Sequence, residues 1–445
     1  MIDFSRIEKY RENNRIEAKR ASGGFPGSVW ETYSAFANTL GGIILLGVEE
    51  RKDKSLHPVE LPDAEALVDE FWRLVNDPRK VSVNILRRDD VAIECVDGKK
   101  IVAITVPRAR REDKPIYIDG DFYKGSYRRN GEGDYRCERE EVDAMLRDAA
   151  LETDDMRAIK DGDASLVKLE SIERFARGCA GSVSCETKML AKSILGAEAD
   201  RLTLAHLMMF GRGEEIRKRI PEFSAIYRNF VEEIVFENLC DFFFYATERF
   251  IDKLESLSMR NENDVFRALR EALVNSIVNA DYRSEGGVVV EEGAREIRFI
   301  NAGGFRIDPN GVKRGGISDP RNRGLIRIIS SVGSAKGAGM GIPGIYTVWK
   351  RYGWKEPVFK EEFSPDRITL TLSFDKRIAK SSDGSDAIYR EMMIAHLTKN
   401  VSASADELAY EVGVEIERAE RILSILMFDG IVVLDEASKK FRLKS

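Results

Sequence analysis

Residues 270–282, "REALVNSIVNADY", combine the apolar content of a buried helix with a polar pattern that such a helix normally lacks. Glu271, Asn275 and Asn279 recur every four residues, which places their side chains on one helix face, and Asp281 lies just beyond. Asparagine is a poor helix former, and buried amides and carboxylates are costly unless something hydrogen-bonds them. The stretch therefore predicts a helix that packs its apolar face on a sheet and turns its polar face toward a bound group.

Two glycine-containing segments follow this helix and indicate what that group is. "INAGGF", residues 300–305, ends a strand-like run, and "GAGMGIPGI", residues 337–345, opens a helical one. Glycines at a helix start let backbone N–H groups approach a phosphate, and the helix dipole favours the anion. A carboxylate and an amide on a facing helix can hold Mg²⁺ through their oxygens. The order of the three segments predicts a phosphate and magnesium site.

The composition excludes several classes of protein. The chain has 445 residues, 43% of them hydrophobic, and a net charge of −6, so any nucleic-acid binding must come from local patches. Five cysteines without CxxC spacing and three scattered histidines argue against a disulfide framework and a His/Cys metal cage. The amino terminus is too charged for a signal peptide, and no apolar run approaches a membrane span. We expect a cytoplasmic protein that does not associate with a membrane.

Hydrophobic periodicity predicts a multidomain α/β protein of α+β character, in four parts. Residues 1–150 predict an α/β domain, in which residues 81–107 contain two strands around an Asp-Gly turn. Residues 151–258 predict a helical connector, and residues 259–378 predict a sandwich of helices on a sheet. Residues 384–445 resemble a winged helix, with three helix candidates followed by a hairpin.

The quoted segments resemble known motifs. "REALVNSIVNADY", "INAGGF" and "GAGMGIPGI" are similar to the N-box and the two glycine motifs of the GHKL ATPases, which have the Bergerat fold. "IEAKR" and "WETYSAFANTLGGIILLGV", residues 16–20 and 30–48, resemble the Schlafen-like, AlbA-type DNA-binding domain. Both occur together in bacterial proteins described as transcriptional regulators, whose GHKL domain is diverged. The two resemblances cover roughly residues 5 to 145 and 255 to 360.

The GHKL resemblance implies ATP and Mg²⁺ as cofactors. Glu271 would polarise the attacking water and Asn275 would hold Mg²⁺, with Glu271 beside the metal. Asn301 stands where the family has an acid that accepts a hydrogen bond from adenine, and an amide lacks that charge. The resemblance therefore implies ATP as a switch, with slow hydrolysis or none. The implied nucleotide-binding residues are Asn275, Asn279, Asp281, Asn301, Gly303, Gly304, Gly337, Gly339 and Gly341.

Two surfaces are candidates for nucleic acid, with DNA favoured over RNA. In the first, arginines alternate with aromatic residues, which suits phosphate contacts and base stacking, although neighbouring acids also fit a solvated hairpin. In the second, lysines lie on the expected wing, although a winged helix also serves protein contacts. Paired half-sites would make the protein a homodimer. The candidate residues are Arg108, Arg110, Arg111, Arg128, Arg129 and Arg136, and in the wing Lys439 and Lys440.

Three functions are compatible with this organisation. The one we favour is an ATP-binding, nucleic-acid-binding transcriptional regulator. The second is an ATP-gated, metal-dependent nuclease, in defence, since some Schlafen relatives are RNases whose acidic residues correspond broadly to Glu12, Glu17 and Glu49. Glu17 with Lys19 equally fits a strand-edge ion pair. The third is a scaffold whose nucleotide fold is inactive, as Asn301 allows. Enzymatic activity stays open.

Overall fold

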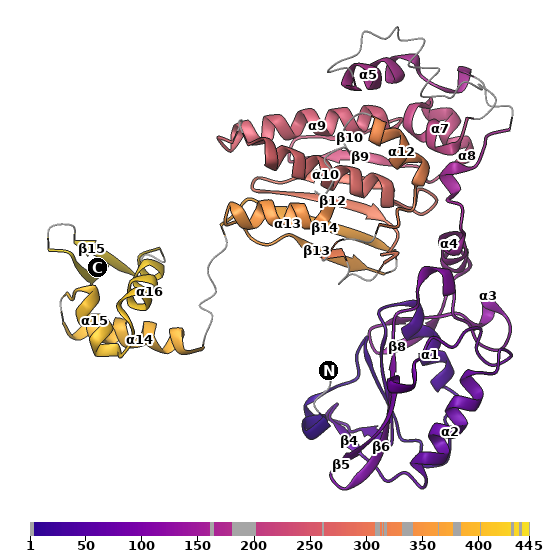
Figure 1. The fold of residues 1–445 in the computed structure, drawn as a ribbon, viewed down its shortest axis with the longest axis horizontal. Coiled ribbons are helices and arrows are strands. Elements are labelled where there is room, and N and C mark those ends of the chain that lie inside the picture. Colours follow the sequence, from indigo (N-terminus) through magenta and orange to yellow (C-terminus); the bar gives the residue numbers. More distant parts are fainter. Residues whose placement is uncertain are drawn as a thin grey trace. The chain divides into compact units, whose positions relative to one another are not determined.

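Two units make up the computed structural model, Met1–Asp375 and Lys376–Ser445. The structure describes residues 4–160, 164–179, 202–259, 262–307, 312–313, 315, 318–331, 341–363, 365–376, 384–400, 402–428, 431–435 and 438–444. Helices and several separate sheets alternate along the chain, which confirms the predicted multidomain α/β class (Figure 1). In the described part of the chain, every helix is too short or too polar to cross a membrane.

The first part of unit 1 is built on a four-stranded sheet in the order β1-β2-β6-β5. Its strands are β1 (Ile16–Lys19), β2 (Gly42–Leu46), β5 (Val91–Val96) and β6 (Lys99–Val106). Strands β1 and β2 are parallel, and β5 and β6 form the predicted hairpin around Asp97 and Gly98. Helices α1 (Val29–Asn38) and α2 (Ala64–Val75) share its core, where the rings of Trp30 and Phe71 stack.

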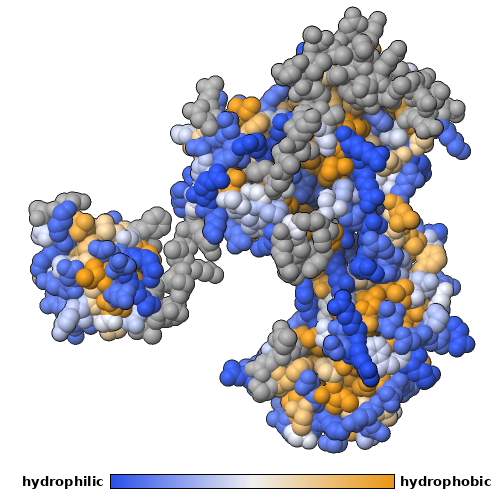
Figure 2. All heavy atoms as spheres, viewed as in Figure 1, coloured by the Kyte–Doolittle hydropathy of each residue, from blue (hydrophilic) through white to orange (hydrophobic). Residues whose placement is uncertain are grey.

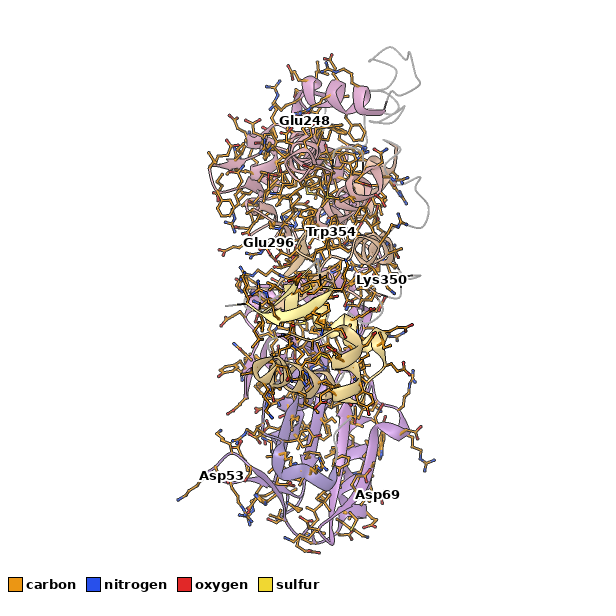
Figure 3. The ribbon with its side chains drawn as sticks, turned by 90° about the vertical axis from the view of Figure 1, so that its left-hand side faces the viewer. Asp53, Asp69, Glu248, Glu296, Lys350 and Trp354 are labelled. Atoms are coloured by element: carbon orange, nitrogen blue, oxygen red, sulfur yellow. The ribbon has the colours of Figure 1, made fainter. Side chains whose placement is uncertain are left out.

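Shorter elements complete this part of unit 1. Helix α4 begins with a capping box between Glu138 and Glu141 and ends this part of the chain. Charged residues such as Asp53 and Asp69 are exposed at the surface of this part of unit 1 (Figure 3). The shorter elements are η1 (Phe4–Lys9), β3 (Val48–Glu50), β4 (Leu56–Pro58), η2 (Arg88–Asp90), η3 (Arg111–Asp113), α3 (Phe122–Gly125), β7 (Tyr127–Asn130), β8 (Gly133–Arg136) and α4 (Arg139–Ala149).

The predicted helical connector contains strands as well as helices. β9 (Ala225–Arg228) and β10 (Glu233–Val235) extend the sheet of the following part, with β9 parallel to β11. β9 has four residues and β10 has three, which is too short for a hydrophobic periodicity to be recognised, so these two strands were not predicted from the sequence. The helices here are η4 (Asp154–Met156), η5 (Ala164–Leu166), α5 (Leu169–Cys179), α7 (Leu204–Phe210), α8 (Gly213–Arg219) and α9 (Leu239–Ser256).

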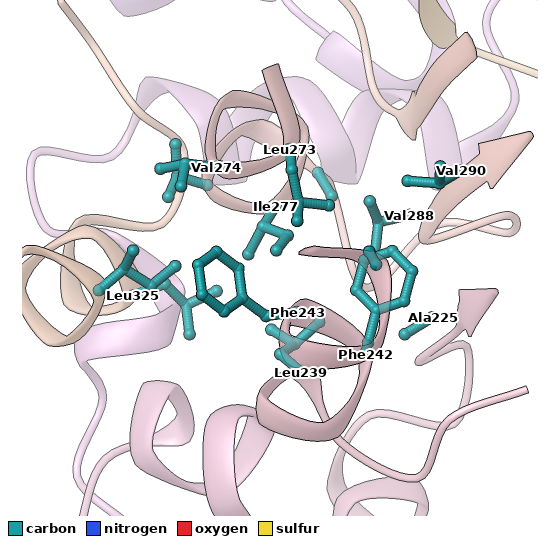
Figure 4. Close-up of a cluster of buried hydrophobic side chains, with 14 of the residues drawn as sticks. Ala225, Leu239, Phe242, Phe243, Leu273, Val274, Ile277, Val288, Val290 and Leu325 are labelled. Atoms are coloured by element: carbon teal, nitrogen blue, oxygen red, sulfur yellow. The ribbon is translucent and has the colours of Figure 1, made fainter. Parts of the chain in front are cut away.

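The rest of unit 1 is a layer of helices on a six-stranded sheet of order β10-β9-β11-β12-β14-β13. Helices α9, α10 and α13 lie over one face of this sheet (Figure 1). Ala225, Phe242 and Val288 come from three elements and lie together in the core between the layers (Figure 4). The elements are α10 (Asn263–Asn279), β11 (Val288–Glu292), β12 (Glu296–Ala302), α12 (Arg323–Ser331), α13 (Gly341–Arg351), β13 (Val358–Glu362) and β14 (Arg367–Ser373).

Unit 2 contains three helices and a hairpin, in the order that the sequence predicts. They are α14 (Gly384–Lys399), α15 (Ala405–Val412), α16 (Ile416–Phe428), and the antiparallel strands β15 (Val432–Asp435) and β16 (Lys440–Leu443). Ser404 caps α15 and Gly413, with φ +74°, ends it. On the face in Figure 2, apolar residues lie in groups among hydrophilic ones in both units.

Candidate functional site

The polar stripe of α10 lines a cavity of about 430 Å³ between the helix layer and the sheet. Glu271, Asn275 and Asn279 face it from α10, and Asn301 faces it from β12. Phe299 and Leu370 supply part of an apolar wall from β12 and β14. The stripe is therefore the polar side of an otherwise largely apolar cavity, which is the usual make-up of a small-molecule site.

Glu271 is the acidic group that the polar stripe of α10 contributes to this cavity. Its carboxyl group is partly buried, and burial raises its pKa above the usual range. Desolvation penalises the charged form, so a cation placed beside Glu271 would restore its ionisation. The group can therefore act as a metal ligand or as a base whose proton affinity is raised.

The two asparagines of the stripe are locked to each other. Asn279 Nδ2 donates to Asn275 Oδ1 over 2.7 Å and to the Asn275 carbonyl over 2.9 Å. Asn275 Oδ1 keeps one lone pair for a second partner, such as a metal-bound water or a cation. Asn301 is 5% exposed, and its Nδ2 donates to the carbonyl of Ala302 over 3.2 Å. The amides are thus held in fixed directions at the cavity wall.

Two of the implied nucleotide residues lie away from the cavity. Asp281 pairs with Arg147 of α4 at 3.1 Å and accepts from Ser284 at 2.7 Å. Gly303 has φ +88°, and a Cβ there would lie 2.5 Å from Arg321 Nη1. Asp281 therefore contributes to the contact with α4, and Gly303 leaves room for the side chain of Arg321. Of the remaining glycines, Gly304 and Gly341 line the cavity, whereas Gly337 and Gly339 lie outside the described residues.

The cavity has a charged end that the sequence did not predict. Arg306 and Asp319 line it, and both also contact the first part of unit 1, at Asp148 and Arg111. Asp319 pairs with Arg111 of η3. Asp148, from the end of α4, accepts from Arg321 Nε at 2.8 Å and from Nη2 at 2.7 Å. Arg306 and Arg321 pair with Asp148, and Asp319 pairs with Arg111, each over 150 residues away, so these pairs leave no local signal in the sequence.

Three of the arginines predicted for nucleic acid instead anchor the two parts of unit 1 together. Arg108 makes a two-pronged pair with Glu361 of β13, at 2.7 and 2.9 Å. Arg128 pairs with Asp366, and Arg111 pairs with Asp319. These guanidinium groups are largely buried against carboxylates that lie 208 to 253 residues away in the chain. In this arrangement the three guanidinium groups are not available to contact the phosphates of a nucleic acid.

The other predicted arginines divide between the interior and the surface. Arg129 has a side chain that is 1% exposed, and it pairs with Glu17 at 2.7 Å and with Asp134 at 2.9 Å. Arg129 therefore has a structural role and holds β7 against β1. Arg110 and Arg136 are exposed. The six arginines therefore do not form a single surface.

The acids of the alternative nuclease site are only partly brought together. Glu12 accepts from the Ala18 N–H at 3.0 Å, and burial raises its pKa, with the charges of Glu17 and Glu50 adding to the shift. Glu17 also pairs with Lys19 at 2.5 Å, as a strand-edge ion pair would. Glu49 contacts Arg20 instead, at 3.5 Å. Among the described residues, no group of three metal-ligating side chains is present.

The lysines predicted for the wing lie at the tip of the unit 2 hairpin. Lys440 begins β16 and pairs with Glu407 of α15 at 3.4 Å. Lys439 precedes it in a left-handed turn, with φ +56°. Lys439 is exposed, and it therefore reaches solvent from the end of the hairpin.

Comparisons with known proteins give a family match for the first part of the chain and similarity to two solved structures. Residues 12–138 match the family model described as Schlafen, AlbA_2. The solved structure of the DIP2311 protein from Corynebacterium diphtheriae is 16% identical, covers 97% of this chain and 79% of its own, and has a TM-score of 0.40. The N-terminal domain of a Nitrosomonas europaea protein described as related to the ATP-dependent DNA helicase RecG is 34% identical. It covers 31% of this chain and 94% of its own, with a TM-score of 0.25. No curated protein matches the chain.

Proposed function

Because residues 12–138 form a Schlafen AlbA_2 domain, we propose that the chain is a nucleic-acid-binding transcriptional regulator switched by ATP and Mg²⁺. One observation carries the nucleotide part of this proposal. The polar stripe of α10 faces a cavity of about 430 Å³ rather than solvent. Asparagines four residues apart on a helix are otherwise hard to account for.

The donor set of the cavity fits a magnesium nucleotide. Glu271 and Asn275 offer oxygen ligands, which Mg²⁺ prefers. Bound Mg²⁺ would neutralise phosphate charge. Gly341 begins α13, whose amino-terminal end favours a phosphate. Asn301 would accept from adenine with a neutral amide, which supports binding with slow hydrolysis or none.

The nucleic-acid part of the proposal assigns DNA to the Schlafen domain. The ion pairs of Arg108, Arg111 and Arg128 leave exposed residues such as Arg110 and Arg136 as its candidate phosphate contacts. We further propose that unit 2 is a winged helix with Lys439 and Lys440 on its wing, that the regulator is a homodimer, and that it works in the cytoplasm. Each of these can be tested apart from the nucleotide site.

Titration calorimetry with a non-hydrolysable ATP analogue tests the nucleotide site. The full chain should bind the analogue more tightly with Mg²⁺, and Asn275→Ala should remove that magnesium dependence. Glu271→Ala should weaken it as well. Asn263→Ala is a matched control, because Asn263 is exposed on the same helix and does not line the cavity. An absence of binding at millimolar analogue, or an unaltered Asn275→Ala profile, would refute the site.

A nuclease gated by ATP is the alternative, and Glu12 is the acid on which we test it, because Glu17 is held by Arg129 and Glu49 contacts Arg20. Cleavage of single-stranded RNA or DNA in the presence of Mn²⁺ should then depend on Glu12. Loss of cleavage in Glu12→Gln, with folding unchanged, would support the nuclease. Absence of cleavage by the natural chain, with ATP present or absent, would leave the regulator.

A further inference from the structure

Arg306 is a buried cation whose partners do not satisfy it. Its side chain is 5% exposed and lines the cavity. Its Nε atom is buried and, among the residues that the structure describes, has no hydrogen-bond partner. The contacts of the guanidinium group are all long: Nε lies 3.4 Å from the Asp319 carboxylate, Nη1 lies 3.7 Å from the Asp148 carboxylate, and Nη2 donates to the Asp148 carbonyl over 3.5 Å. Arg321, by contrast, holds Asp148 at 2.7 and 2.8 Å.

The electrostatic surroundings of Arg306 leave its charge incompletely compensated. Burial lowers its pKa, and the positive charges of Arg321 and Arg111 lower it further, whereas Asp148 and Asp319 oppose this. A buried charge is costly unless it is paired and hydrogen-bonded. An anion in the cavity would supply the missing partner.

We propose that Arg306 binds phosphoryl oxygens of the ligand and so couples the cavity to the Schlafen domain. This rests on the proposed nucleotide function and names the residue that recognises the phosphates. A guanidinium group presents several donors in a plane, which suits the oxygens of a phosphate. Arg306 is directed at the cavity from the loop that follows β12.

The coupling follows from the residues that Arg306 touches. Asp148 lies in α4 of the amino-terminal part, and Asp319 pairs with Arg111 of that part. An anion that neutralises Arg306 removes its attraction to Asp148 and Asp319 as well as its repulsion of Arg321 and Arg111, and the attraction is the larger effect. Phosphate occupancy should therefore loosen this docking, and α4 should exchange its amide hydrogens faster.

The test uses the full chain, with tripolyphosphate, a non-hydrolysable ATP analogue and adenosine as separate ligands. Arg306→Gln should weaken binding of the first two about tenfold to a hundredfold, as expected for a charge-assisted contact, and leave adenosine unchanged. Arg306→Lys should restore part of the affinity, which separates loss of charge from loss of fold. Arg298→Gln is the matched control, because Arg298 is exposed on β12 and does not line the cavity.

The three ligands separate failure of this inference from failure of the nucleotide function. If Arg306→Gln binds the analogue and tripolyphosphate as tightly as the natural chain, the inference is wrong and the nucleotide function stands. If the natural chain binds neither analogue nor adenosine, the nucleotide function fails, while Arg306-dependent tripolyphosphate binding still establishes the anion site. Absence of all binding overturns both. Unchanged hydrogen exchange in residues 139–149 on tripolyphosphate binding would overturn the coupling.

Discussion

Replacing Asp148 by Asn should uncouple the two parts of unit 1 and lower the stability of the whole unit. The change removes one charge and almost no volume. It leaves Arg321, which is 10% exposed, without the carboxylate that now holds it through two hydrogen bonds. Arg321 also donates to the carbonyls of Asn279 and Gly304, so it cannot turn outward without breaking these contacts.

The size of the effect follows from burial. Removing one partner of a buried ion pair costs about 3–5 kcal/mol, because the other charge is left uncompensated. Asp148 is 24% exposed, so water screens part of the loss, and we expect about 2–3 kcal/mol. Burial alone would raise the pKa of Asp148, but Arg321, Arg306 and Arg147 together hold it below its usual value. The natural pair is therefore a net favourable one at neutral pH.

Urea unfolding followed by tryptophan fluorescence is a direct assay. All four tryptophans of the chain, Trp30, Trp72, Trp349 and Trp354, lie in unit 1, so fluorescence does not report unit 2. We expect a midpoint lower by about 1 M urea for Asp148→Asn.

A double-mutant cycle with Arg321→Met should show that the two changes are not additive. Glu362→Gln is the control, because its pair with Arg367 is exposed, and its midpoint should not change. Additive single changes, within about 0.5 kcal/mol, would refute the reasoning.

Two further predictions concern neighbouring groups. Burial lowers the pKa of Lys114 from 10.5 to about 7, with Arg108 and Arg128 adding to the shift. Between these pH values the unfolded chain binds the extra proton, so the free energy of unfolding should rise with pH, by at most about 1.4 kcal/mol per pH unit. Lys114→Met should remove this rise, and an unchanged pH profile would contradict it. Gly303→Ala should cost about 1–3 kcal/mol, because φ is +88° and Cβ would meet a guanidinium group, and a thermal melt of full-length variants would check it.

Features that depend on local periodicity could be predicted from the sequence. The recurrence of Glu271, Asn275 and Asn279 is a property of one helix, and the structure brings all three to one cavity. The hairpin around Asp97 and Gly98 is equally local. In both cases the residues that determine the geometry lie within about 20 positions of each other, and a single sequence displays the whole pattern.

Features that depend on distant charge pairs could not be predicted. The density of arginines beside aromatic residues indicated a phosphate-binding surface. The sequence shows each arginine charge but not the distant carboxylate that pairs with it. Arg108 and Glu361 are 253 positions apart, and the sequence around either residue does not indicate that the two form a pair. The same reasoning applies to Arg129, whose pairing with Glu17 turns one predicted nucleic-acid residue and one predicted catalytic acid into a buried pair.

The segment after β12 serves the cavity and the docking contacts at once. A Cβ at Gly304 would lie 2.8 Å from Glu361 Oε1, and that carboxylate also accepts from the Phe305 N–H at 2.9 Å and from Arg108. Arg108 of the Schlafen domain also donates to the Phe305 carbonyl over 2.8 Å, so it holds the loop that would meet a nucleotide. A ligand that shifts Phe305 or Arg306 must also alter the contact that Arg108 makes with this loop, because the ligand and Arg108 would hold the same short segment. This shared backbone, rather than a long chain of contacts, is the physical basis on which a nucleotide could control the Schlafen domain.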